Sequence, residues 1–163
     1  GSGHAGASAE AEPTGIATPE GPVAAPDGHR AVPLSDFGGG EEAVWKEALV
    51  QLKSAGLKPA LARLMGAAYT AASPRQRSRY RLLMAKLCLK ARRPDLARPL
   101  MEELFALVEE MNLARWESPI WIADVLDTLR RCLAGADPDS EDAVRAKDLL
   151  KRICTLDVTQ AIE

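Results

Sequence analysis

Few residues of this chain could do chemistry, and their positions exclude most reactions. The two histidines, His4 and His29, both lie in the Gly-, Ala- and Pro-rich first forty residues. The rest of the chain therefore has no imidazole for general base catalysis, a Ser-His-Asp arrangement or a histidine-containing zinc site. The three cysteines, Cys88, Cys132 and Cys154, form no CxxC pair. An odd number of widely spaced cysteines on apolar helical faces is typical of reduced, buried thiols in a cytosolic protein.

Carboxylates are more numerous, but their spacing favours structural roles. Four acids lie close together at Asp137, Asp139, Glu141 and Asp142. Because this stretch lacks the loop glycine and the distal glutamate of an EF-hand, helix capping is favoured over cation binding. The acidic pairs at 102–103 and 109–110 are adjacent on one helix, as on a solvated face. The glycines at 38–40 match no phosphate-binding loop. We predict no catalytic residue, no cofactor and no metal site.

The strongest charge pattern is a basic segment without acids at residues 75–93, which contains Arg75, Arg77, Arg79, Arg81, Lys86, Lys90, Arg92 and Arg93. Tyr80 is its single aromatic residue, so the stacking platforms of a nucleic-acid groove are missing. Acids elsewhere in the chain are the favoured partners, within or between subunits: Glu102, Glu103, Glu109, Glu110, Glu117, Asp124 and Asp127. Residues 1–41 hold six acids against one arginine, which leaves a net charge of +3 on the remainder. We predict no nucleic-acid partner.

The elements that carry these residues are helices. Residues 1–40 contain four scattered large aliphatic residues and one Phe, too few to offset the entropy of ordering, so we predict a disordered Ala/Pro/Gly-rich linker there. Its abrupt start leads us to expect that another domain precedes it. Residues 41–163 have helical periodicity, and no stretch alternates with period two. We predict an all-α domain of about six antiparallel-packed helices, preceded by the disordered arm.

Local signals mark where these helices begin and end. Ser73-Pro74 and Ser118-Pro119 each place a capping serine before a first-turn proline. Gly56 and Gly135 are expected to end helices. The fourth helix, from about residue 94 to 112, is apolar on two faces, so we expect it to be the central one. A short turn of helix is expected from Asp157.

Two tryptophans flank the start of the fifth helix. Trp116 is expected to plug the end of the helical hairpin, and a contact with another protein is the alternative. Trp121 shares its helical face with Asp124, Thr128 and Arg131, so we predict that it is exposed and contacts another subunit. The candidate oligomer interface is therefore Trp116, Ile120, Trp121 and Asp124.

Several segments, taken in order, resemble one known pattern: Arg93-Pro94-Asp95-Leu96-Ala97, Leu100-Met101-Glu102-Glu103-Leu104, Trp116-Glu117-Ser118-Pro119, Leu129-x-x-Cys132-Leu133 and Ile153-Cys154-x-Leu156-Asp157. Over about residues 42–160 the chain resembles the carboxy-terminal, VasJ-like domain of TssA/ImpA-family subunits of type VI secretion systems. The resemblance implies a non-enzymatic, cytoplasmic bacterial subunit. Such domains form rings, often stacked with five- or sixfold symmetry, and support assembly of the baseplate and of the tail tube and sheath.

A second reading is a monomeric tetratricopeptide-like adaptor that binds a peptide or protein. It would need similar repeats of about 34 residues, and the sequence shows no convincing one. No apolar run reaches the roughly 18 to 20 residues that span a bilayer, so we expect no membrane partner.

Overall fold

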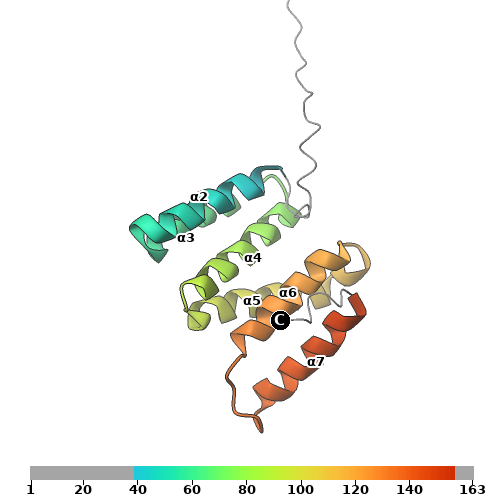
Figure 1. Cartoon of the computed structure of the whole chain (residues 1–163). Coiled ribbons are helices and arrows are strands. Elements are labelled where there is room, and N and C mark those ends of the chain that lie inside the picture. Colours follow the sequence, from blue (N-terminus) through green and yellow to red (C-terminus); the bar gives the residue numbers. More distant parts are fainter. Residues whose placement is uncertain (1–38, 157–163) are drawn as a thin grey trace, which may run out of the picture. The chain divides into compact units, whose positions relative to one another are not determined.

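The structure, a computed structural model, describes residues 39–156, which all belong to one unit of the chain. They form six α-helices and one short 3-10 helix: α2 (Gly39–Ala55), α3 (Leu57–Tyr69), α4 (Pro74–Lys90), α5 (Pro94–Glu110), η3 (Leu113–Arg115), α6 (Pro119–Cys132) and α7 (Glu141–Leu156) (Figure 1). No strand occurs between residues 39 and 156, which confirms the predicted all-α fold of six helices. The predicted linker, apart from Gly39 and Gly40 in α2, and the helical turn expected from Asp157 lie outside the described residues.

The predicted serine caps start two of the helices. The Ser73 hydroxyl accepts a hydrogen bond from the Gln76 amide at 3.1 Å and starts α4. The Ser118 hydroxyl accepts from the amides of Ile120 and Trp121 and starts α6. Each serine satisfies amides that have no partner within the helix, and the proline that follows lacks an amide to satisfy.

Positive backbone φ angles follow several of the helices. Gly56 has a φ of 98° and separates α2 from α3, while Gly135 has a φ of 83° after α6. A side chain is strained in this region, so glycine is the suitable residue at both places. Asn112, with a φ of 52°, ends α5 and turns the chain into η3. Asparagine tolerates this left-handed conformation better than most residues.

Each helix packs against the next one along the chain, so the six form a stack that runs from α2 and α3 to α7 (Figure 1). In addition α4 contacts both α2 and α6. Ion pairs show the helix directions: Arg98 binds Asp142 and Arg145 binds Glu102, so residue numbers on α5 and α7 rise together. Alternate helices thus run parallel and neighbours antiparallel, as short connections require.

Two apolar clusters form the core, and α4 contributes to both. One cluster holds Leu82, Ala85 and Cys88 of α4 with residues of α5, α6 and α7. The other holds Tyr80, Leu83 and Leu87 of α4 with residues of α2 and α3. The prediction that this helix is covered on more than one side is confirmed.

The expectation that α5 is the central helix is wrong. The buried positions of α5 are Ala97, Met101, Leu104 and Val108, which lie on a single face. In α6 an unbroken run of polar and apolar residues is buried from residue 125 to 129, because this helix packs against α4, α5 and α7. The centre of the fold is therefore α4 with α6.

Candidate interaction surfaces

Glu117, in the corner between η3 and α6, is held by two arginines of α4. Its carboxylate oxygens lie 2.8 Å from Arg75 Nε and 3.0 Å from an Arg79 guanidinium nitrogen. The Glu117 side chain is 11% exposed and that of Arg79 only 6%, so this pair is removed from water. A pair so placed needs both partners, because either charge alone would remain buried without compensation.

The titration of Glu117 reflects these surroundings. Burial acts to raise the pKa of the Glu117 carboxyl, but the hydrogen bonds and charges of Arg75 and Arg79 together outweigh it, and the pKa lies below its ordinary value. Glu117 is therefore an anion at neutral pH and fixes the corner to α4.

Further ion pairs link α4 to α5 and to α6. Lys86 of α4 lies 2.6 Å from Asp124 of α6, and Arg81 lies 3.4 Å from Glu103 of α5. The predicted complementarity between the basic segment and acids of the same chain is confirmed for these pairs and for Glu117. Glu102 and Glu109 instead bind arginines of α7, and Asp127 binds Arg130 and Arg131 of its own helix.

The prediction that Trp121 is exposed is wrong. Its side chain is 3% exposed, and the Arg79 guanidinium lies over the ring, 5.3 Å from its centroid. Asp124 and Thr128, the polar residues that suggested a solvated face, lie on the side that packs against α4, where Asp124 binds Lys86 and accepts a hydrogen bond from the Thr128 hydroxyl. The part of this polar face that holds Asp124 and Thr128 is therefore covered by α4, whereas Arg131 stays 62% exposed.

Trp116 and Ile120 are the exposed members of the predicted interface. Trp116 is 80% exposed, so in this structure it does not plug the helical hairpin, and Ile120, four residues later, is 53% exposed. Met111, in the same connection between α5 and α6, is 59% exposed. We call Trp116 and Ile120 the apolar corner. Large apolar side chains grouped on a surface are typical of interaction sites.

The predicted capping role of the acidic stretch at 137–142 agrees with the structure in part. The Ser140 hydroxyl accepts from the Ala143 amide at 3.2 Å and starts α7, and an Asp137 carboxylate oxygen accepts from the Asp139 amide. Asp142 binds Arg98 through two bonds of 2.9 Å and so links α7 to α5. No cluster of potential metal ligands occurs among residues 39–156.

The cysteines differ in exposure. All three are free thiols; Cys88 is buried and Cys132 half-buried, whereas Cys154 is exposed, contrary to the prediction that all three are buried. Burial raises the pKa of Cys132 to about 11 and also raises the pKa of Cys88.

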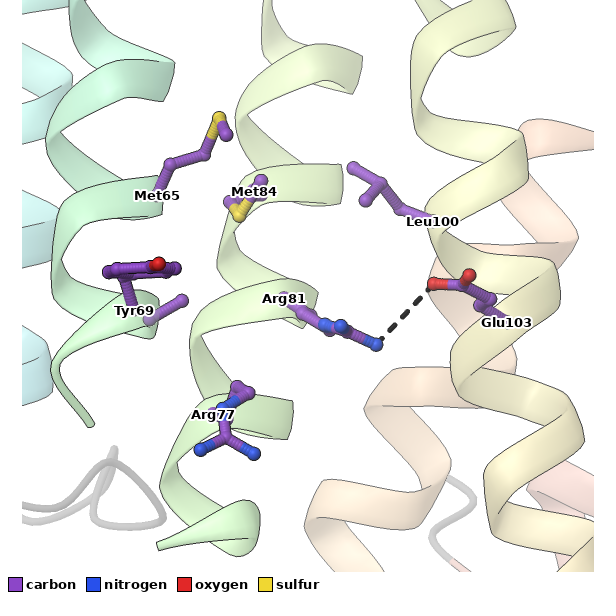
Figure 2. A pocket seen from close by; sticks show the side chains of 8 residues that line it. Met65, Tyr69, Arg77, Arg81, Met84, Leu100 and Glu103 are labelled. Carbon is purple, nitrogen blue, oxygen red and sulfur yellow. Dashed lines mark hydrogen bonds and ion pairs between the residues drawn. The ribbon is translucent and has the colours of Figure 1, made fainter. Parts of the chain in front are cut away.

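Sequence reasoning missed a groove between α3, α4 and α5. Its volume is about 510 Å³, and its lining is largely apolar: Met65, Ala68, Tyr69, Arg77, Arg81, Met84, Leu100 and Glu103 (Figure 2). Each wall comes from a different helix, so no single periodicity marks it. The exposed fractions of Met65, 57%, and Tyr69, 90%, make it a second apolar surface of the described unit.

Comparison with known proteins now identifies the class. The fold is a stack of helical hairpins that offers two apolar surfaces and, among the described residues, no metal-ligand cluster. The family model described as "Type VI secretion, EvfE, EvfF, ImpA, BimE, VC_A0119, VasJ" matches residues 21–129. The chain belongs to this family, and it is a component of type VI secretion. The match ends within α6, so α7 lies outside it.

No curated protein and no solved structure gives a significant match to the chain. None of the helices at 39–156 has the length and apolar character needed to cross a bilayer.

Proposed function

We propose that this chain is a structural, non-enzymatic subunit that assembles with copies of itself into a ring in the bacterial cytoplasm. The ring, like those implied by the resemblance to TssA carboxy-terminal domains, supports assembly of the baseplate and of the tail tube and sheath. Family membership supports a place in the secretion apparatus. The observation that carries self-assembly is the 80% exposure of Trp116, four residues before the exposed Ile120.

The position of Trp116 strengthens this reading. The corner that carries it is tied down by the Glu117 ion pairs on one side and by the Ser118 cap on the other. A large aromatic side chain on a fixed backbone loses little conformational entropy on binding, which is why such residues dominate many interfaces. A tryptophan that only faced water would not need its backbone held in place by these ion pairs and this cap.

Light scattering of the full chain at tens of micromolar tests the proposal. A ring predicts a mass several times that of the 17.5 kDa monomer. A monomer at this concentration would refute it. Trp116→Asp is expected to lower the mass while the helical circular dichroism stays unchanged. Val144→Asp is the matched control, because Val144 is an apolar residue of α7 with 57% exposure.

One observation favours a second candidate, a monomeric tetratricopeptide-like adaptor. Alternate helices run parallel, and the groove over α4 is wide enough for side chains of a peptide. The adaptor reading requires a monomer with the groove open, so the same light-scattering measurement separates it from the ring.

A further inference from the structure

The groove between α3, α4 and α5 has an apolar floor and two walls (Figure 2). Met84 of α4 lies at the floor, Met65 and Tyr69 of α3 form one wall, and Leu100 of α5 lies on the other. Methionine side chains adapt their shape to an incoming apolar group at little cost. Such a lining suits an aromatic side chain.

The charge of the rim favours an acidic occupant. Arg77 and Arg81 line the groove, against the single carboxylate of Glu103. Arg81 lies 3.4 Å from Glu103, whereas the exposed Arg77 forms no ion pair with any residue from 39 to 156. A carboxylate next to the apolar anchor of the occupant would compensate this guanidinium.

The sequence directly before α2 combines these two groups. Phe37 is the only Phe, Tyr or Trp among the first forty residues, and Asp36 precedes it. Residues 1–41 hold six acids against one arginine, so this stretch is opposite in charge to the rim. The family model begins at residue 21, so Asp36 and Phe37 lie within the matched stretch, whereas residues 1–20 lie outside it.

The start of α2 lies at the same end of the stack as the Tyr69 wall of the groove. Arg63 of α3 lies 2.6 Å from Glu47 of α2, and the two helices run antiparallel. Tyr69 comes six residues after Arg63 and Glu41 six residues before Glu47, so Tyr69 lies at about the level of Glu41. The chain therefore enters α2 close to the groove.

Phe37 is near enough in the chain to reach this end of the groove. Gly40, in the first turn of α2, lies against α4, since a Cβ added to it would be 3.8 Å from the Tyr80 hydroxyl oxygen. An extended chain spans about 3.3–3.6 Å per residue, and packed helices lie about 8–10 Å apart. The two residues from Phe37 to Gly39, together with the phenyl side chain, cover such a distance.

We propose that Phe37 docks in the α3–α5 groove of its own chain, against Met65 and Tyr69, with the Asp36 carboxylate on Arg77. A segment tethered this closely has an effective concentration in the millimolar range, so a weak contact is enough to fill the groove and a second copy is at a disadvantage. The inference is independent of self-assembly. It adds that any peptide partner of the groove must first displace this segment.

Fluorine NMR of the full chain tests the contact, because the sequence holds just two phenylalanines, Phe37 and Phe105. Labelling with 4-fluorophenylalanine gives one signal for each, and Phe37→Leu identifies them. The Phe37 signal is expected to differ from that of a labelled synthetic peptide of residues 31–40. It is also expected to be shielded from a soluble gadolinium chelate, which broadens the signal of the free peptide.

Charge variants test the rim. Arg77→Glu is expected to lower the ratio of docked to free Phe37 by a factor of about three or more, as the loss of a surface ion pair does. Adding Asp36→Lys to Arg77→Glu exchanges the two charges and is expected to restore the ratio. Lys90→Glu is the matched control, because Lys90 is an exposed cation of the same helix outside the groove, and it is expected to leave the ratio unchanged.

The apolar contact is tested by Met65→Ser combined with Tyr69→Ser. Both positions are exposed and tolerant of polar side chains, and helical circular dichroism checks the fold. Loss of these two anchors is expected to lower the docked ratio at least about tenfold.

Two results would show that Phe37 does not occupy the groove. One is a wild-type signal that matches the free peptide in position and in broadening by the chelate. The other is a shielded signal that neither Arg77→Glu nor the Met65 and Tyr69 variant changes.

Mixing separates a contact within one chain from a contact between copies. A labelled Asp36→Lys chain is combined with an unlabelled Arg77→Glu chain, so that matched charges meet only between different molecules. An unchanged Phe37 signal supports docking within the chain. A signal that becomes shielded on mixing would assign the segment to the groove of a neighbouring copy and overturn the proposal.

Discussion

Replacement of Trp121 by alanine gives the sharpest test of the packing. Trp121 is 3% exposed, and a buried aromatic side chain removes about 150–250 Å² from water. At about 25 cal/mol per Å² this burial contributes roughly 4–6 kcal/mol, and measured losses for buried Trp or Phe to Ala are about 3–5 kcal/mol. Loss of the Arg79 cation–π contact adds about 0.5–2 kcal/mol.

Trp121→Ala does not lose the full sum of these two contributions, because the Arg79 guanidinium keeps its bond to Glu117 and is not left as an unpaired buried charge. We expect Trp121→Ala to lower the free energy of unfolding by about 4 kcal/mol, a large part of the roughly 5–15 kcal/mol available to a domain. Trp116→Ala, at 80% exposure, should change it by less than about 0.5 kcal/mol.

The measurement is urea unfolding followed by far-ultraviolet circular dichroism. Self-association makes apparent stability depend on concentration, so both substitutions are compared at several protein concentrations, and Trp121→Ala is also made in the Trp116→Asp background. A loss below about 1 kcal/mol for Trp121→Ala in that background would refute the packing of Trp121 against α4. An equal loss for Trp116→Ala at every concentration would show that Trp116 is a core residue.

Three further results are expected. Because the pKa of Glu117 is lowered in the folded state, its ion pairs stabilise the fold above the ordinary pKa of 4.5, and this stabilisation is lost as the pH falls through the folded pKa. Glu117→Gln should lower the free energy of unfolding, measured in urea, by about 2 kcal/mol at pH 7. An equally large loss at pH 2 would contradict the charge argument. A thiol reagent at pH 8 should modify Cys154 quickly and leave the other two cysteines until the protein unfolds, since burial raises the pKa of Cys132 to about 11; three equal rates would be incompatible with this packing. A double-mutant cycle of Arg98→Ala and Asp142→Ala should give only a small favourable coupling at low salt, because both side chains are more than one third exposed, and a coupling unchanged by 1 M salt would exclude a screened ion pair.

Residues close to the helix ends predicted where several helices begin and end. Cap-then-proline pairs started α4 and α6 at the predicted residues, and glycines with positive φ ended α2 and followed α6. These signals depend on backbone groups within a few residues of the boundary, so the sequence contains all that they need. The all-α class followed from the helical periodicity of the apolar residues, with no stretch of period two.

The exposure of the two tryptophans required the tertiary structure. A helical face shows which residues lie together, but the neighbouring helix decides whether that face meets water. The face of Trp121 was polar and yet buried, because Lys86 and Arg79 of α4 supply the matching charges. The sequence favoured Trp116 as a plug for the helical hairpin, but the turn at Asn112 and the cap at Ser118 leave it 80% exposed.

The groove beside α4 depended on tertiary structure to the same degree. Met65, Met84 and Leu100 lie on three helices, and each occurs in an ordinary apolar stripe. Their common surface arises because α4 contacts both α3 and α5, leaving its own side chains as a floor between them. The sequence by itself determined where the helices begin and end and which charges could pair. Only the packing of one helix on another decided which apolar side chains were buried and which remained free to meet a second subunit.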